Sequence, residues 1–292
     1  MGRPALAAVA ALLVTASPAL AQAPDSLVGR YAVWVDGERS DLDAVVEAAL
    51  GADVVFLGER HDDAVAHALQ LRVLRALDER AGRANPGRPV ALALEMFEAD
   101  VQPVLDEYLA GAVDERGFLE AARPWSNYAA DYRPLVEYAR DRGLAVVATN
   151  APARHVRAVA RGGVGALDGL PAASLAWYPP RPWAPASDAL AAKFAEAMGG
   201  MAGHGGPSAD GMLAAQNLRD LTMAWHTAEA ARGALVVHVN GSFHSAGGLG
   251  IPEHLARFAP DARALVVTFE PAEDPAAAPR AGGVVILTQA GA

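Results

Sequence analysis

Four short apolar runs in this chain each end at a cluster of polar residues, and this pattern constrains the fold more than any other feature. The runs span residues 54–57, 90–94, 144–148 and 235–239. Short apolar runs with helical stretches between them are typical of βα units, whose parallel strands place their carboxyl ends at one edge of a sheet. We therefore expect an α/β fold with a mostly parallel central sheet flanked by helices. Such sheets bind ligands at that edge.

The residues that follow these runs have side chains suited to chemistry. Glu59 and His61 follow the first run, Glu95 follows the second, and His244 comes shortly after the fourth. Although these residues are far apart in the sequence, the parallel topology predicts that they converge in one crevice. Further residues expected at the edge of this site are Gly58, Arg60, Asn150, Asn240, Gly241, Gln216 and Asp220.

The four principal residues leave two kinds of chemistry open. Glu59, His61, Glu95 and His244 supply two imidazoles and two carboxylates, a ligand set suited to Zn²⁺ or to another divalent ion such as Mn²⁺. The same groups can perform acid–base catalysis without a metal, with a carboxylate orienting a histidine that activates water. A third interpretation is purely structural, since helix caps and satisfied polar groups also occur at strand ends.

The remaining histidines are expected to have other roles. We expect His67 on a solvated helix face, with a supporting position behind His61 as the alternative, His238 in the core, and His155, His226 and His254 at the surface. The segment 162–211 is rich in proline and glycine and contains one apolar helical stretch, which indicates a lid or a small helical insertion. The rest of 22–292 is expected to form a single domain.

The first 21 residues have the pattern of a secretory signal. One charged residue, Arg3, precedes an apolar stretch that is too short to span a bilayer, and Ala19-Leu20-Ala21 forms a small-x-small cleavage site. We therefore expect a periplasmic or secreted protein without a membrane span. The chain has no cysteine, which excludes both a disulfide and a lipid anchor on cysteine. Its formal net charge of −10 argues against nucleic acid as a partner.

Several motifs together resemble the ChaN-like branch of the Tiki superfamily, a haem-binding uptake family. The resemblance covers about residues 33–269. The motifs that carry it are Leu57-Gly58-Glu59-Arg60-His61-Asp62, Leu94-Glu95-Met96-Phe97, Trp125 with Tyr132-Arg133-Pro134, Asn150-Ala151-Pro152, the helix from Ala215-Gln216 to Met223, and Gly241-Ser242-Phe243-His244.

This resemblance implies haem as a cofactor and a role in iron uptake, with haem- or iron-uptake components or a second copy of the chain as candidate partners. Ferric haem accepts a phenolate or an imidazole, and its propionates favour arginine. We expect Tyr178 as the axial ligand ahead of Tyr132 and His204, with Arg181 near a propionate. Relatives in the superfamily hydrolyse peptide or ester bonds at the same G-x-x-H motifs, so the resemblance also implies a metal-dependent hydrolase as the alternative.

Overall fold

The computed structural model describes residues 27–84, 88–199, 207–279 and 281–291. Within these residues the strands form an eight-stranded sheet in the order β2-β1-β8-β7-β3-β6-β4-β5. The strands from β8 to β5 run parallel to one another, whereas β1 is antiparallel to both β8 and β2. The expected α/β fold with a mostly parallel sheet is therefore confirmed. The strands are β1 (Tyr31–Val35), β2 (Glu38–Ser40), β3 (Val54–Glu59), β4 (Val90–Glu98), β5 (Ala145–Asn150), β6 (Leu235–Gly241), β7 (Ala264–Ala272) and β8 (Val284–Gln289).

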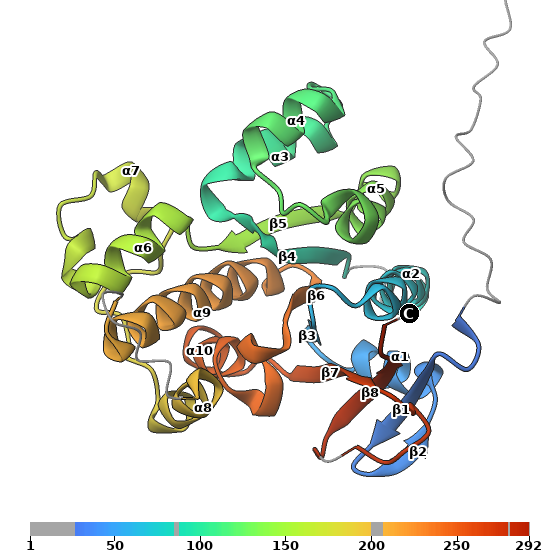
Figure 1. Ribbon diagram of the computed structural model, residues 1–292. Helices are drawn as coiled ribbons and strands as arrows, with labels where there is room; N and C mark the ends of the chain where they lie inside the picture. Colours follow the sequence, from blue (N-terminus) through green and yellow to red (C-terminus); the bar gives the residue numbers. More distant parts are fainter. Residues whose placement is uncertain (1–26, 85–87, 200–206, 280, 292) are drawn as a thin grey trace, which may run out of the picture.

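Helices cover both faces of this sheet (Figure 1). Helices α1 to α5 contribute to the core on one face, and α9 and α10 contribute to the core on the other. Their bounds are α1 (Leu42–Leu50), α2 (Ala64–Ala84), α3 (Gln102–Leu109), α4 (Glu115–Ala122), α5 (Arg133–Arg142), α9 (Ala209–Ala231) and α10 (Ile251–Phe258).

Strand β3 shows why the central strands are continuous apolar runs. Val55 and Leu57 lie in the core beneath α1 and α2, whereas Val54 and Phe56 lie in the core beneath α9 and α10. All four side chains are fully buried. Successive strand residues point to opposite faces, and here both faces are covered, so no position along the strand favours a polar residue.

The turn between β3 and α2 is fixed by Asp63. Its Oδ1 accepts hydrogen bonds from the backbone N–H groups of Val65 and Ala66 at 3.0 and 2.9 Å, which caps the first turn of α2. Its Oδ2 accepts a hydrogen bond from Thr288 Oγ1 on β8 at 2.5 Å. Because Asp63 is held by both a helix and a strand, the short turn that carries His61 has a defined position at the sheet edge.

The described residues between α6 and α9, 163–199, contain helices that lie beside α9. This segment contains η5 (Val164–Leu167), α7 (Ala172–Leu175) and α8 (Asp188–Met198), and it follows α6 (Ala153–Gly162). Helices α6 and α8 lie on either side of α9 (Figure 1). Lys193 of α8 donates hydrogen bonds to the carbonyl oxygens of Phe243 and Ala246, at 2.9 and 2.8 Å. The segment is thereby attached to the loop that carries His244.

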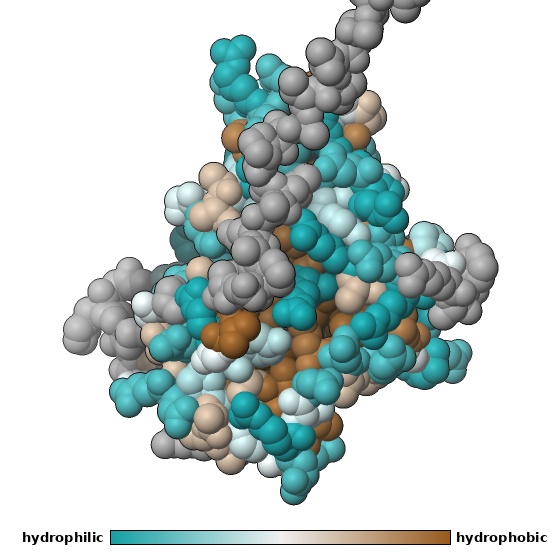
Figure 2. Space-filling view, turned by 90° about the vertical axis from the view of Figure 1, so that its right-hand side faces the viewer, coloured by the Kyte–Doolittle hydropathy of each residue, from teal (hydrophilic) through white to brown (hydrophobic). Residues whose placement is uncertain are grey.

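The face of the protein drawn in Figure 2 is mainly polar, as expected when most apolar residues lie in the interior. On the side that bears α1, α2 and the β1–β2 hairpin, polar residues predominate around a hydrophobic strip (Figure 2). None of the helices in the described ranges is long and apolar enough to cross a membrane. The expected signal segment, residues 1–21, lies outside the described residues.

Candidate functional site

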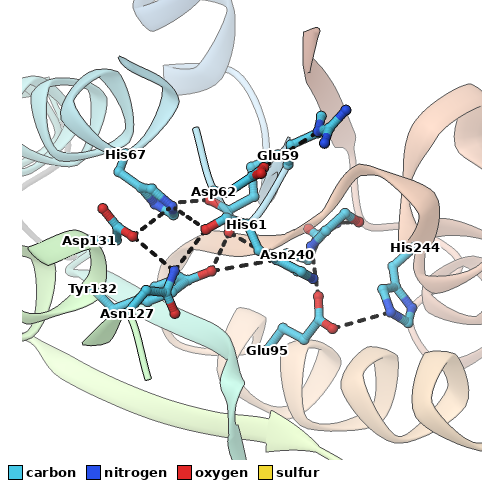
Figure 3. Close-up of polar contacts among 12 residues, drawn as sticks. Glu59, His61, Asp62, His67, Glu95, Asn127, Asp131, Tyr132, Asn240 and His244 are labelled. Atoms are coloured by element: carbon cyan, nitrogen blue, oxygen red, sulfur yellow. Dashed lines mark hydrogen bonds and ion pairs between the residues drawn. The ribbon is translucent and has the colours of Figure 1, made fainter. Parts of the chain in front are cut away.

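The carboxyl ends of neighbouring strands bring the four principal residues together. Glu59 at the end of β3 lies in register with Gly241 at the end of β6. His61 follows on the turn after β3, Glu95 lies near the end of β4, and His244 lies in the short helical turn after β6. Figure 3 shows these side chains around a common centre.

This edge of the sheet is hollowed into an open cleft with a volume of about 850 Å³. Most of the residues that line it are polar, and the aromatic side chain of Phe243 is an apolar group among them. The lining residues are Glu59, Arg60, His61, Asp62, Ser126, Asn127, Asp131, Gln216, Gly241, Ser242, Phe243 and His244.

Strand β4 is longer than the sequence predicts. The apolar run predicts a strand that ends at Glu95, whereas β4 continues to Glu98 with a shift of register against β5 between Leu94 and Glu98. Its pairing with β6 stops at Leu94, opposite Val239. Glu95 therefore lies just beyond that ladder, and its carboxylate accepts a hydrogen bond from the backbone N–H of Gly241 at 2.6 Å.

Glu59 is buried and contacts four polar groups. Its Oε1 accepts a hydrogen bond from the Tyr132 hydroxyl at 2.5 Å and lies 3.3 Å from Nδ1 of His61. Its Oε2 accepts a hydrogen bond from Gln70 at 2.5 Å and lies 3.1 Å from Nδ1 of His67. A carboxylate with so many partners has a single orientation, so Glu59 is a fixed support for the exposed histidine beside it.

His61 is the exposed member of the site. Its side chain is 48% exposed, compared with 1% for Glu59. Trp125 packs against the imidazole edge to face, with the ring centroids 4.5 Å apart. Burial lowers the pKa of His61, but its hydrogen bond to Glu59 and the charge of Glu95 raise it, and the net shift is upward.

His244 lies on the other side of Glu95 and is buried. Its Nε2 lies 3.2 Å from Oε1 of Glu95, and its Nδ1 contacts Asp220 and lies 2.9 Å from Nε2 of Gln216. Burial lowers the pKa of this imidazole, but the charges of Glu95 and Asp220 outweigh burial and raise it to about 10. His244 is therefore a cation at neutral pH, held between two carboxylates.

The pKa of Glu95 shifts in the opposite direction to that of His244. Burial raises the pKa of Glu95, but the charge and hydrogen bond of His244 outweigh this effect and lower it to about 2, with further contributions from His61 and the Gly241 N–H. The buried carboxylate is thus ionised across the physiological range. It links the buried imidazole to the exposed one electrostatically.

Two glycines allow the three strand ends to approach so closely. A β-carbon on Gly58 would lie 2.8 Å from Oγ of Ser245 and 3.1 Å from Cα of Ser242. A β-carbon on Gly241 would lie 2.8 Å from Cε1 of His61. Any larger residue at either position would force the loop after β6 or the imidazole to move.

The other residues expected at the site edge form a supporting network. Asn150 donates to the carbonyl oxygen of Glu95 at 3.1 Å and accepts from Arg219 at 3.0 Å. Asn240 is buried and donates to Oγ of Ser245 at 2.9 Å. Gln216 and Asp220 lie on the polar face of α9. Gln216 lines the cleft, whereas Asp220 is fully buried against His244. Arg60 lines the cleft with a largely exposed side chain.

Three of the histidine interpretations were wrong. His67 is buried behind the site, which is the alternative to the expected solvated helix face, and its Nε2 lies 3.1 Å from the carbonyl oxygen of His61. His155 and His254, expected at the surface, are buried as well. His238 lies in the core as expected, between Thr149 and Asn240.

The residues expected to bind haem lie in different places. Tyr132 forms the wall behind Glu59, and burial together with the Glu59 charge raises the pKa of its hydroxyl. Tyr178 is 3% exposed in a separate hydrophobic cluster, where its hydroxyl lies 2.7 Å from Nδ1 of His155. Arg181 pairs with Asp168 near that cluster. His204 lies outside the described residues.

The expected divalent metal site has no support in this geometry. Among the described residues, no group of three or more His, Asp or Glu side chains is arranged to hold a metal ion. Glu95 and His244 pair with each other, whereas His61 turns its Nδ1 toward Glu59. The arrangement instead presents one exposed imidazole, oriented by a carboxylate, which can act as a single metal donor or accept a proton.

Comparison with known proteins identifies the family and the fold. A family model described as haem-binding uptake, Tiki superfamily, ChaN matches residues 45–255. A structure described as cofacial heme binding to ChaN of Campylobacter jejuni aligns with a TM-score of 0.63 and 16% identity, over 89% of this chain and 97% of that chain. At that identity the structural match shows a shared fold.

Two other similarities are more limited. The chloroplastic protein RETICULATA-RELATED 5 of Arabidopsis thaliana is 32% identical over 133 residues, which is 44% of this chain and 17% of the plant protein. This chain therefore matches less than a fifth of that protein's length. A variant of an erythromycin esterase aligns over 87% of this chain with 14% identity and a TM-score of 0.43, which is too low to carry an argument about function.

Proposed function

This chain belongs to the ChaN family of haem-binding uptake proteins in the Tiki superfamily, and on that basis we propose that it binds haem in the cleft at the carboxyl edge of its sheet. The observation that carries the location is the half-exposed imidazole of His61, which lies in the cleft beside buried, charged groups. A bound haem would supply an iron atom that takes one or two further ligands from the chain.

The residues of the cleft fit such a group. Its volume of about 850 Å³ lies in the range of cofactor sites. Trp125 and Phe243 are aromatic groups at or beside the cleft that can cover part of a macrocycle. Arg60 offers a cation for a propionate, whereas Asp62 and Asp131 disfavour a propionate at their own positions.

The biological role in this proposal is haem or iron uptake outside the cytoplasm. The description of the family as an uptake family supports the role, and the signal-like residues 1–21 support export to the periplasm or the medium. The proposed partners are components of haem or iron uptake, together with a second copy of the chain. A metal-dependent hydrolase is not proposed, because the described residues lack a metal-binding arrangement.

Haemin titration of the purified full chain tests the proposal. We expect a saturable shift of the Soret band with a defined stoichiometry, and a free energy of unfolding that increases with the logarithm of the free haemin concentration once the site is saturated. Serum albumin is a positive control, and a chain of similar size and acidity but a different fold is the negative control. Unsaturable absorbance changes equal to those of the negative control would overturn the proposal.

A further inference from the structure

A small pocket lies between α10 and the proline-rich segment 179–184, and among the described residues it shares none of its lining with the cleft. Its volume is about 170 Å³. Sites for drug-sized ligands have volumes of roughly 300–1,000 Å³, so this pocket suits a smaller molecule, about the size of a single ring. The residues that line it are mostly apolar, but His254 and Arg257 of α10 are polar members of the lining.

The aromatic walls of the pocket are held in place by their neighbours. Trp183 donates its indole N–H to the carbonyl oxygen of Pro179 at 2.8 Å, and the guanidinium carbon of Arg181 lies 4.3 Å from the centroid of the Trp183 ring. Phe258 packs edge to face against Trp225, with the ring centroids 5.5 Å apart. Aromatic rings favour offset or edge-to-face contact with another ring, so these walls suit a flat aromatic group.

The hydrogen bonds around His254 determine which of its nitrogens carries the proton. Asn217 donates from Nδ2 to the carbonyl oxygen of Ala184 at 2.9 Å, and its Oδ1 lies 2.9 Å from Nε2 of His254. An amide oxygen only accepts hydrogen bonds, so Nε2 is the protonated nitrogen. In the neutral ring, Nδ1 then bears a lone pair.

This lone pair is a buried acceptor without a donor. His254 is 3% exposed, and among the described residues its Nδ1 has no hydrogen-bond partner. Burial lowers the pKa of the imidazole, and the charge of Arg257 adds to this effect against the opposing charges of Asp220 and Glu253, so the ring is neutral at pH 7. A buried acceptor left unpaired destabilises the fold, whereas a ligand that donates an O–H or N–H to it removes that penalty.

Arg257 places a positive charge at the same pocket. It lies three residues after His254 on α10, and side chains at that spacing share a helix face, with their β-carbons about 5–6 Å apart. Arg257 is exposed, and it forms no ion pair with any carboxylate in the described ranges. A small carboxylate can therefore pair with this guanidinium without displacing an existing partner.

We propose that this pocket binds a small aromatic carboxylate that also carries a hydroxyl or N–H donor, with the donor facing His254 and the carboxylate facing Arg257. The volume limits the ligand to about one ring, the unpaired lone pair requires a donor, and the guanidinium selects an anion. The proposal does not depend on haem binding, because the cleft and this pocket have no described lining residue in common.

Isothermal titration calorimetry of the full chain with hydroxybenzoates tests each contact separately. The meta and para isomers of hydroxybenzoate carry a ring, a donor and a carboxylate, whereas benzoate lacks the donor and phenol lacks the carboxylate. We expect saturable binding of at least one isomer. That isomer should bind about 2–10-fold more tightly than benzoate, the range for one hydrogen bond between neutral groups. It should bind up to about fivefold more tightly than phenol, the range for an exposed ion pair.

Two variants locate the binding. His254→Gln keeps a donor for Asn217 but removes the Nδ1 acceptor, so the hydroxybenzoate should lose its advantage over benzoate. Arg257→Gln should weaken the binding of hydroxybenzoate and of benzoate equally and should leave phenol unchanged. Arg161→Gln, on α6 and outside the described lining of the pocket, is the matched control and should change none of the three. Circular dichroism and urea unfolding show whether each variant is folded.

Each result supports or overturns the proposal. Absence of saturable binding of either isomer to the wild type would overturn it, and so would equal affinities for hydroxybenzoate and benzoate. Binding that survives Arg257→Gln but falls with Arg60→Gln would mean that the ligand occupies the cleft, and the proposal would fail. Because Arg257 is exposed, its variant still decides the matter if His254→Gln does not fold.

Discussion

The backbone of Gly241 lies so close to His61 that a β-carbon at position 241 would sit 2.8 Å from Cε1 and 3.1 Å from Nε2 of the imidazole. Gly241→Ala should therefore displace the ring while leaving the core intact, because His61 is an exposed side chain that can move. We expect weaker haemin binding with little change in the free energy of unfolding. Gly169→Ala is the control, since nothing lies within 4 Å of the added carbon. Equal haemin affinity of the two variants would contradict the proposed haem site beside His61.

Removal of the Tyr132 hydroxyl tests the support behind Glu59. Tyr132→Phe takes away a buried hydrogen bond to a charged group, which should lower the free energy of unfolding by about 1.5–3 kcal/mol. Tyr178→Phe breaks a bond between neutral partners and should cost less, about 1 kcal/mol. Urea denaturation measures both, and a larger loss for Tyr178→Phe would refute the ranking.

The convergence of the site was predictable because it follows from topology. Each of β3, β4 and β6 is a buried apolar run, and parallel pairing places Glu59, Glu95 and His244 at one edge whatever the loops between them do. The true end of β4 at Glu98 could not be predicted, because the register shift after Leu94 depends on contacts with β5 that no local sequence pattern reveals.

The supporting residues could not be predicted in the same way. Gln70 and His67 lie on α2 and reach Glu59 only because that helix packs directly beneath the turn. His155 was assigned to the surface because its partner, Tyr178, is 23 residues away in a segment without a clear periodicity. The helical spacing of His67 relative to the apolar positions on α2 was the one available signal that it faces inward.

The paired shifts of Glu95 and His244 predict how stability depends on pH. The pKa of His244 rises from 6.5 to about 10 on folding, so its contribution is complete below pH 6.5 and is lost as the pH rises toward 10. The pKa of Glu95 falls from 4.5 to about 2, so its contribution is complete above pH 4.5 and is lost as the pH falls toward 2. Their combined contribution should be greatest between about pH 4.5 and 6.5.

Urea unfolding from pH 6 to 9.5 measures the alkaline limb. A single proton can change the free energy of unfolding by at most about 1.4 kcal/mol per pH unit. His244→Asn should be less stable than wild type at pH 6 and should show a flatter decline toward pH 9.5. Parallel pH profiles for the two proteins would show that His244 does not titrate in this range.

Arg60 should contribute to haem binding through its charge. Its exposed guanidinium lines the cleft, where its Nε lies 3.5 Å from Oδ1 of Asp62. If it pairs with a propionate, Arg60→Ala should weaken haemin binding by no more than about fivefold, because exposed pairs are worth up to about 1 kcal/mol. The loss should shrink at high salt and vanish with the dimethyl ester of haemin. Arg161→Ala, on α6 and outside the cleft lining, is the control. A salt-independent loss, or an equal loss with the ester, would exclude the propionate contact.

A crystal structure of the full chain with haemin tests the central claim most directly. The account predicts the macrocycle in the cleft at the carboxyl edge of the sheet, beside His61, Arg60 and Phe243. A haem bound outside this cleft would contradict it.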